Sequence, residues 1–293
     1  MKIDNMDSWA NAPSPAVQAV CADGLGLADE ARSLRRDIAA TLYASGGGHY
    51  GGALSVIDIL LTLYRRQLRV TPAAPRHPLR DRLILSKGHA AVALYALLRR
   101  LAYFDAPLAG YADFDSILEG HPDMACIPGI DFSSGSLGQG ISVGIGMALA
   151  LRDTDQAAWV VLGDGECQEG QVWEAAMLAA ACRLDNIHVI VDCNRFQEWG
   201  WAATAADAHP PPVADMAAKW RAFGWHVIEC DGHDHGALAQ VYAQARAWKG
   251  QPSMILAHTN KGKGVPLIER APWRFHCETV TEEEHAQIME SLA

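Results

Sequence analysis

Asp164 and Asn194 each follow an apolar run of the kind found in buried strands, over residues 158–162 and 187–191 respectively. A helical pattern over about residues 171–183 lies between the two runs, which predicts a strand–helix–strand unit. The carboxyl ends of such parallel strands share one edge of the sheet, where ligands bind in open α/β sheets. Carboxylate and amide oxygens suit Mg²⁺, which completes its shell with water and phosphate oxygens. The pair therefore predicts a metal-bridged diphosphate site or, alternatively, two polar loops that only cap strands.

The segment Gly163–Ala175 reads GDGECQEGQVWEA, and the glycines on both sides of Asp164 allow a sharp turn and a close approach of a ligand. This segment resembles the thiamine diphosphate–Mg²⁺ motif in the N-terminal half of transketolases. The likeness extends from about Glu30 to His276, which is most of the chain. Cys193 departs from the family pattern, but the neighbouring position that would bind the metal is kept.

The resemblance implies that Asp164 and Asn194 are side-chain ligands of Mg²⁺, or of another divalent cation such as Ca²⁺ or Mn²⁺. The backbone carbonyl oxygen of Phe196 is the third protein ligand that it implies. Four further residues of the motif are expected to contact thiamine diphosphate: Gly163, Gly165, Glu166 and Glu169, the last near the interface between the two halves of the cofactor site. Asp164 and Asn194 count among the cofactor-binding residues as well.

A second glycine-rich segment, SSGSLGQG at residues 133–140, precedes a long apolar run that ends near Leu151. A loop of glycine and serine at the N-terminus of a helix suits an anion or a polar ring. The segment resembles a second element of the transketolase pattern. The resemblance implies that Gly135 and Leu137 line the path of the aminopyrimidine ring and the diphosphate.

Four histidines stand in separate loops that the same resemblance brings to one edge of the sheet: His49, His89, His121 and His276. Taken alone, the glycine-rich loop before His49 reads equally as a flexible connector, and a histidine such as His89 is more often structural. The resemblance implies that all four contact the substrate hydroxyls and the oxyanion of the cofactor adduct. Tyr50 and Cys277 replace residues usual in the family, which indicates either a specialised acceptor or drift.

Strand patterns alternate with helical patterns along the chain and predict an α/β fold. We expect a three-layer α/β/α arrangement around a central, mostly parallel sheet, and the resemblance identifies it as the thiamine diphosphate-binding fold. Residues 1–25 are expected to form an N-terminal arm, and residues 26–293 one diphosphate-binding domain. Residues 202–214 are expected to form a loop or lid, and residues 231–235 a loop with capping residues. The expected strands are 82–86, 158–162, 187–191, 225–230 and 253–258, and the expected helices include 27–44, 55–66, 171–183, 215–223, 235–248 and 281–291.

The composition excludes several classes of partner. Half of the 293 residues are hydrophobic and the net charge is −10 without a basic cluster, which argues against nucleic acid and anionic membranes. No apolar run reaches the length of a membrane span, and the first residues lack the apolar core of a signal peptide. The seven cysteines have no CxxC spacing, which favours reduced thiols over disulfides or a zinc site. We therefore expect a cytoplasmic protein.

The resemblance implies a transferase that moves a two-carbon glycolyl unit from a ketose, or ketose phosphate, to an aldehyde acceptor. It also implies a partner: a C-terminal transketolase subunit with the pyrimidine-domain glutamate, in an α2β2 assembly without which the chain is inactive. One alternative is another thiamine diphosphate enzyme, similar to a deoxyxylulose-phosphate synthase or a 2-oxo acid dehydrogenase. A second is a non-catalytic regulatory subunit. An ordinary dinucleotide-binding protein is disfavoured, because no G-x-G-x-x-G follows the first strand.

Overall fold

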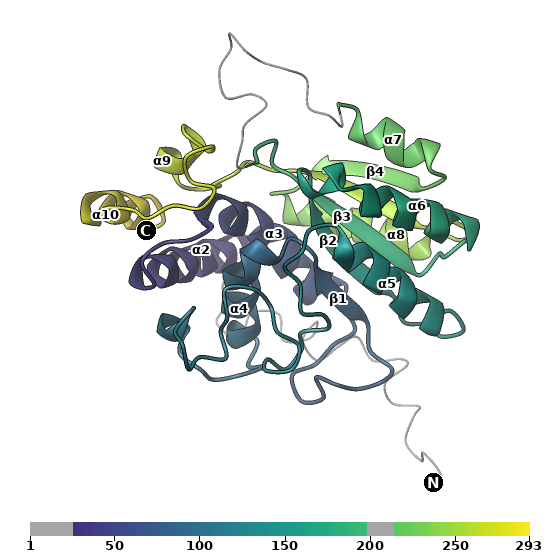
Figure 1. Ribbon diagram of the computed structural model, residues 1–293, viewed down its shortest axis with the longest axis horizontal. Helices are drawn as coiled ribbons and strands as arrows, with labels where there is room; N and C mark the ends of the chain where they lie inside the picture. The colour runs from purple at the N-terminus through teal and green to yellow at the C-terminus, as the bar shows by residue number, and fades with distance from the viewer. Residues whose placement is uncertain (1–25, 198–213) are drawn as a thin grey trace.

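Five parallel strands form the centre of the computed structural model, which describes residues 26–197 and 214–293. The predicted arm at residues 1–25 and most of the predicted loop at 202–214 lie outside the described residues. The strand order is β1-β2-β3-β5-β4, and every neighbouring pair is parallel. All five carboxyl ends therefore lie at one edge of the sheet (Figure 1). The strands are β1 (Arg82–Leu85), β2 (Ala158–Gly163), β3 (Ile187–Cys193), β4 (His226–Asp231) and β5 (Ser253–His258).

Helices cover both faces of this sheet, as the sequence predicts. On one side, α3 (Tyr50–Arg66) and α8 (His235–Ala247) contact the strands, and α2 (Leu27–Ala44) and α4 (Ala91–Arg100) pack against α3 in the same buried cluster. On the other side, α5 (Gln139–Ala150) and α7 (Met216–Ala222) contact the strands, and α6 (Gly170–Ala181) packs against α5. Figure 1 shows α5 and α6 in front of the sheet and α8 behind it. No helix within residues 26–197 and 214–293 combines the length and apolarity needed to cross a membrane.

Side chains of the central strands alternate between the two faces. Val160 belongs to the buried cluster under α5 and α6, whereas its neighbours Trp159 and Val161 belong to the cluster under α3 and α8. Because both faces are buried, the strands read as continuous apolar runs rather than as an alternation of apolar and polar residues. The expected three-layer α/β/α arrangement is confirmed.

Two helix boundaries differ from the expected ones by more than one residue. α3 begins at Tyr50 and not at Ser55, since Gly51 and Gly52 are part of the helix. A Cβ atom on Gly51 would lie 2.7 Å from Cγ of Lys261, so the glycine allows a close packing contact that a local pattern does not reveal. α6 ends at Ala181, and Arg183 takes a left-handed conformation with φ +50° that closes the helix.

The C-terminal segment folds back over the start of α3. α10 (Glu282–Ser291) contacts α2, and Figure 1 shows these two helices side by side although they come from opposite ends of the chain. An isolated antiparallel bridge joins Gly48 to Glu278. Gly47 has φ +134°, and a Cβ atom there would lie 2.6 Å from the carbonyl oxygen of Glu278. The glycines before His49 thus allow the two backbone segments to approach closely.

The remaining short helices are η1 (Gly88–Ala90), η2 (Leu108–Gly110), η3 (Glu166–Gln168) and α9 (Pro266–Glu269).

Candidate functional site

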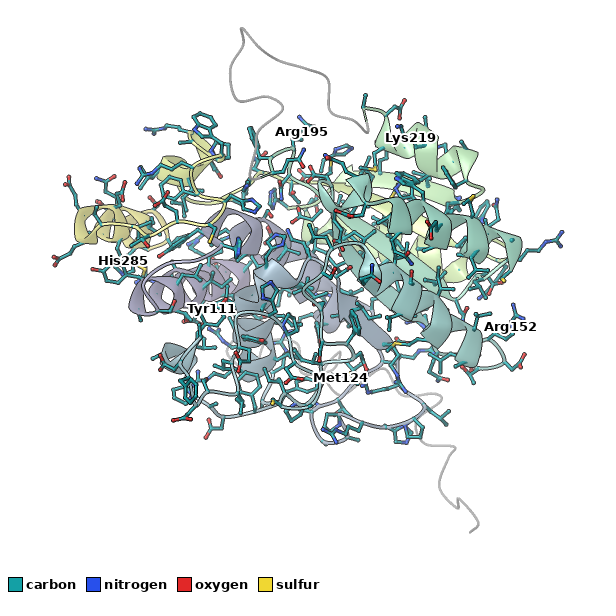
Figure 2. All side chains as sticks on the ribbon, in the orientation of Figure 1. Tyr111, Met124, Arg152, Arg195, Lys219 and His285 are labelled. Carbon is teal, nitrogen blue, oxygen red and sulfur yellow. The ribbon has the colours of Figure 1, made fainter. Side chains whose placement is uncertain are left out.

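The loops that follow β2 and β3 meet at the carboxyl edge of the sheet. Oδ1 of Asp164 accepts a hydrogen bond of 2.8 Å from the backbone N–H of Gly165, and Oδ2 accepts one of 2.6 Å from that of Arg195. Arg195 has φ +66°, an unusual conformation for a residue with a side chain, and this curls the loop toward Asp164. Figure 2 labels Arg195 at this site and Arg152 at the far end of α5.

The carboxylate of Asp164 has no cationic partner among the described residues. Burial raises its pKa to about 6, and the neighbouring carboxylate of Asp192 adds to the effect. Asp164 is half-buried. With a raised pKa and only two N–H donors, its carboxylate is poorly compensated, and a bound divalent cation would stabilise its charged form. The arrangement at Asp164 therefore fits the predicted metal.

Asn194 and Phe196 lie on the same curled loop. The side chain of Asn194 is buried, and its Oδ1 accepts a 3.1 Å hydrogen bond from the N–H of Phe196. The carbonyl oxygen of Phe196 accepts a long hydrogen bond of 3.4 Å from Nζ of Lys261 and keeps a second lone pair. No group of three or more His, Cys, Asp or Glu in the described ranges could hold a metal. The predicted set differs in kind, because it joins one carboxylate, one amide and one carbonyl oxygen, all hard donors that suit Mg²⁺.

A buried ion pair that the sequence pattern does not reveal lies directly beneath this site. Nζ of Lys87 donates to Oδ2 of Asp192 at 2.5 Å, and the two side chains are 1% and 0% exposed. The same carboxylate accepts hydrogen bonds from the hydroxyls of Ser55, at 2.7 Å, and Thr259. The pair joins the loop after β1 to the end of β3 and fixes the base of the site. Lys87 lies within the same sequence segment as His89, but that segment does not indicate that Lys87 forms a buried ion pair.

Three of the four predicted histidines come together above this base. The ring centroids of His49 and His89 are 5.1 Å apart, those of His49 and His276 5.3 Å, and those of His89 and His276 5.6 Å. The carbonyl oxygen of His276 lies 2.8 Å from Nδ1 of His49, and Nδ1 of His276 lies 3.0 Å from Nζ of Lys261. Residues that are 227 positions apart in the sequence thus form one cluster.

The partners of these rings decide where their protons lie. A carbonyl oxygen only accepts, so Nδ1 of His49 carries its proton and Nε2 is an acceptor. An ammonium group only donates, so Nδ1 of His276 is the acceptor and Nε2 carries the proton. Burial lowers the pKa of His49 and of His89, and burial together with Lys261 lowers the pKa of His276 to about 3. The cluster is therefore neutral near pH 7 and offers both an acceptor and a donor.

The fourth histidine lies beside the second glycine-rich loop. A Cβ atom on Gly135 would lie 3.6 Å from Cδ2 of His121, so the ring faces that loop. The hydroxyl of Tyr95 donates to the carbonyl oxygen of His121 at 2.8 Å and fixes its backbone. Gly135 is exposed, and Leu137 keeps 38% of its surface exposed, which is unusual for a leucine of a packed loop.

Glu166 and Glu169 occupy different environments. Glu166 is buried, and its carboxylate accepts hydrogen bonds from the hydroxyl of Ser86 at 2.5 Å and from the N–H groups of Gly138 and Gly163 at 2.9 and 3.0 Å. It therefore ties the loop after β2 to the loop before α5. Glu169 is exposed at the N-terminus of α6.

Known proteins resemble this chain in sequence over most of its length. A family model described as "Transketolase, thiamine diphosphate binding domain" matches residues 27–293. The chain is 40% identical over 248 residues to "6-deoxy-6-sulfo-D-fructose transketolase subunit SqwG" of Clostridium sp. (strain MSTE9), a match that covers 84% of this chain and 88% of that protein. It is 36% identical over 256 residues to an apulose-4-phosphate transketolase subunit of Phocaeicola vulgatus, and this match covers 86% and 89% of the two chains.

Among solved structures, the transketolase of Campylobacter jejuni superposes with a TM-score of 0.81 at 29% identity. The match covers 91% of this chain but 42% of that one, so the chain spans less than half of the longer protein. The similarity confirms the predicted fold class.

Proposed function

The chain belongs to the transketolase family, within its thiamine diphosphate-binding domain, and from this premise we propose that it is the N-terminal subunit of a two-chain transketolase. In this proposal residues 26–293 act as one diphosphate-binding domain in the cytoplasm. A separate C-terminal subunit supplies the glutamate of the pyrimidine domain, and the two chains assemble as α2β2. Two relatives support this division, because their names describe subunits and this chain covers 88% and 89% of their lengths.

Asp164, Asn194 and the carbonyl oxygen of Phe196 hold Mg²⁺ in this proposal. When bound, thiamine diphosphate supplies the carbon nucleophile that cleaves a ketose beside its carbonyl group. The observation that carries the proposal is the convergence at one sheet edge of a carboxylate without a cationic partner among the described residues, Asp164, and a neutral histidine cluster. Neither feature serves the core, and together they match a metal-bound diphosphate beside groups that handle hydroxyls.

The histidines position the sugar and move protons. Nε2 of His49 is free to accept a proton from a substrate hydroxyl, whereas Nε2–H of His276 is free to donate a hydrogen bond to a developing oxyanion. His89 is the third member of this cluster, with its ring 5.1 Å from that of His49 and 5.6 Å from that of His276, and His121 contacts the substrate from the side of Gly135. Neutral rings suit this role because they bind hydroxyls without the cost of burying a charge.

The donor is a ketose with an anionic group at its far end. The names of two relatives support this choice, since one contains a sulfo sugar and the other a sugar phosphate. A donor panel of 6-deoxy-6-sulfo-D-fructose, apulose 4-phosphate and an ordinary ketose phosphate therefore tests the substrate class.

The central experiment assays ketol transfer by the chain alone and after mixing with its C-terminal subunit, with thiamine diphosphate and Mg²⁺ present. We expect transfer only from the mixture. Robust transfer by the chain alone would overturn the two-chain proposal. Decarboxylation of a 2-oxo acid without ketol transfer would assign the complex to another thiamine diphosphate class. Failure of the complex to bind the cofactor would favour a regulatory subunit.

A matched pair of variants tests the metal ligand. Asp164→Asn should weaken Mg²⁺-dependent binding of thiamine diphosphate to the complex by at least about tenfold, measured by calorimetry. The control is Asp153→Asn, an exposed acid next to Arg152 at the far end of α5 (Figure 2), which should bind like the unaltered protein. Equal binding by both variants would contradict the assignment of Asp164.

A further inference from the structure

A cluster of charged and titratable side chains lies outside the site, between α3 and the loop that follows β4. Its centre is Asp58, whose side chain is 4% exposed and pairs with the guanidinium of Arg35. Oδ2 of Asp58 lies 2.6 Å from Nδ1 of His233, and Oδ1 lies 3.5 Å from Nε2 of His235. Nδ1 of His235 also lies 2.7 Å from the hydroxyl of Thr62.

Only part of this loop serves the expected capping role. Oδ1 of Asp234 accepts hydrogen bonds from the N–H groups of Gly236 and Ala237 and caps α8. His233 and His235 take no part in the cap and point toward α3 instead. The histidines therefore require a separate explanation.

The partners of His233 assign its tautomer. Its Nε2 accepts a 2.8 Å hydrogen bond from the backbone N–H of Asn260, which only donates. The proton consequently lies on Nδ1, and Asp58 accepts it. The neutral ring of His233 therefore connects two groups. It donates a hydrogen bond from Nδ1 to the carboxylate of Asp58, and it accepts one at Nε2 from the backbone N–H of Asn260.

Asn260, whose backbone N–H donates to His233, directly precedes Lys261. Nζ of Lys261 reaches both His276, at 3.0 Å, and the carbonyl oxygen of Phe196, at 3.4 Å. The backbone around it is held from the other side by the carbonyl oxygen of Gly51, which accepts from the N–H of Gly262 at 3.1 Å. The turn that contains Lys261 is thus held by a hydrogen bond to His233 on one side and by a hydrogen bond to Gly51 on the other.

We infer that His233 is a positioning residue of the proposed transketolase reaction, which holds the turn at Asn260 so that Lys261 keeps the His276 ring in one tautomer. His233 contacts neither the candidate metal ligands nor the histidine cluster and acts through the backbone N–H of Asn260. If the turn shifts, the ammonium group leaves Nδ1 of His276, and the ring no longer presents a fixed Nε2–H toward the cluster. The inference rests on the proposed function for its kinetic effect but not for its structural one.

Two substitutions separate the two hydrogen bonds of His233. In His233→Asn the amide nitrogen can replace Nδ1 and donate to Asp58, but nothing reaches the N–H of Asn260. In His233→Gln the longer side chain can bring its amide oxygen to the position of Nε2 and accept from Asn260, while the bond to Asp58 is lost. Each variant loses one hydrogen bond, so a purely structural role predicts similar effects from both.

We expect His233→Asn to lower kcat of the two-subunit complex about tenfold or more with a small change in KM, because slight misplacement of a reacting group slows chemistry by such factors. His233→Gln should keep kcat within about threefold of the unaltered protein by the same reasoning. His235→Gln is the control: it removes a contact to Thr62 in the same cluster and should change the thermal midpoint without changing kcat.

A spectroscopic measurement on the full chain keeps the inference independent of activity. With nitrogen-15 in the histidine rings, His276 should show the Nε2–H tautomer in the unaltered chain and in His233→Gln, and a mixture in His233→Asn. Its resonance is assigned by its loss in His276→Gln. An inactive complex that still shows this pattern contradicts the proposed function and supports the inference.

Equal kcat values in His233→Asn and His233→Gln, together with the same His276 tautomer in both, would overturn the inference that His233 positions Lys261. Should His233→Asn not fold, the Gln variant decides alone, because a tenfold loss of kcat in a folded His233→Gln would also overturn it.

Discussion

The ion pair of Lys87 and Asp192 offers the sharpest test of the physical reasoning about the site. Both side chains are at most 1% exposed, and their charged atoms are 2.5 Å apart. Lys87→Met removes the ammonium group and leaves the carboxylate with two hydroxyl donors, from Ser55 and Thr259. The carbonyl oxygen of Gly52 also loses a donor at 3.2 Å. Removing one partner of a buried pair costs about 3–5 kcal/mol, which we expect here because no other cation pairs with Asp192 among the described residues.

Urea denaturation of the single and double variants measures this effect. Lys87→Met/Asp192→Asn removes both charges, and it should be less destabilised than Lys87→Met alone by about 1–3 kcal/mol. The matched control is Lys249→Met, because Lys249 pairs with Asp185 at 4.0 Å but keeps 69% of its side chain exposed. A surface pair of this kind contributes about 0–1 kcal/mol. A loss below about 1 kcal/mol in Lys87→Met, or a double variant that equals the sum of the singles, would refute the reasoning.

Two further predictions concern protons and packing. Burial lowers the pKa of His276 from 6.5 to about 3, so between these values the unfolded chain binds a proton there that the folded chain does not, and stability falls as pH falls. Acidification from about pH 7.5 to 5.5 should therefore lower the urea midpoint less in His276→Gln than in the unaltered chain, and equal slopes would contradict this. In α5, a Cβ atom on Gly144 would lie 2.5 Å from Cγ2 of Val160, whereas one on Gly146 meets nothing within 4 Å. Gly144→Ala should cost about 1–3 kcal/mol and Gly146→Ala should add about 0.4–1 kcal/mol, and a reversed order would refute the packing argument.

The strands were predictable because burial on both faces leaves a pattern within each strand's own few residues. β2 and β3 are buried on both faces, so each reads as a short continuous apolar run that ends at a polar residue. The start of α3 was not predictable in this way. Glycine disfavours a helix by about 1 kcal/mol per residue, yet Gly51 is helical, and only a glycine fits there because Lys261, which is distant in the sequence, packs against it.

The residues of the candidate site also fall into those that local sequence identifies and those that it does not. Asp164 and Asn194 were identified because they stand in a short motif and at strand ends, which local sequence describes. The pair of Lys87 and Asp192 joins residues 105 positions apart, and that of Asp58 and His233 joins residues 175 apart. A single sequence carries no signal that such residues meet. Only the resemblance placed His276 in the site, and the structure brings it beside His49 and His89.

The glycine-rich loop before α3 explains how the two ends of the chain build one histidine cluster. The N–H of Gly51 donates to the carbonyl oxygen of Phe275 at 3.0 Å, and Gly48 pairs with Glu278. His276 lies between these two backbone contacts, so its position follows from the loop rather than from its own side chain. A side chain at Gly47 would collide with Glu278 and shift the segment that carries His276. The absence of side chains in this loop is therefore a requirement of the cluster, and His49 stands next to it because the same backbone approach aligns both rings.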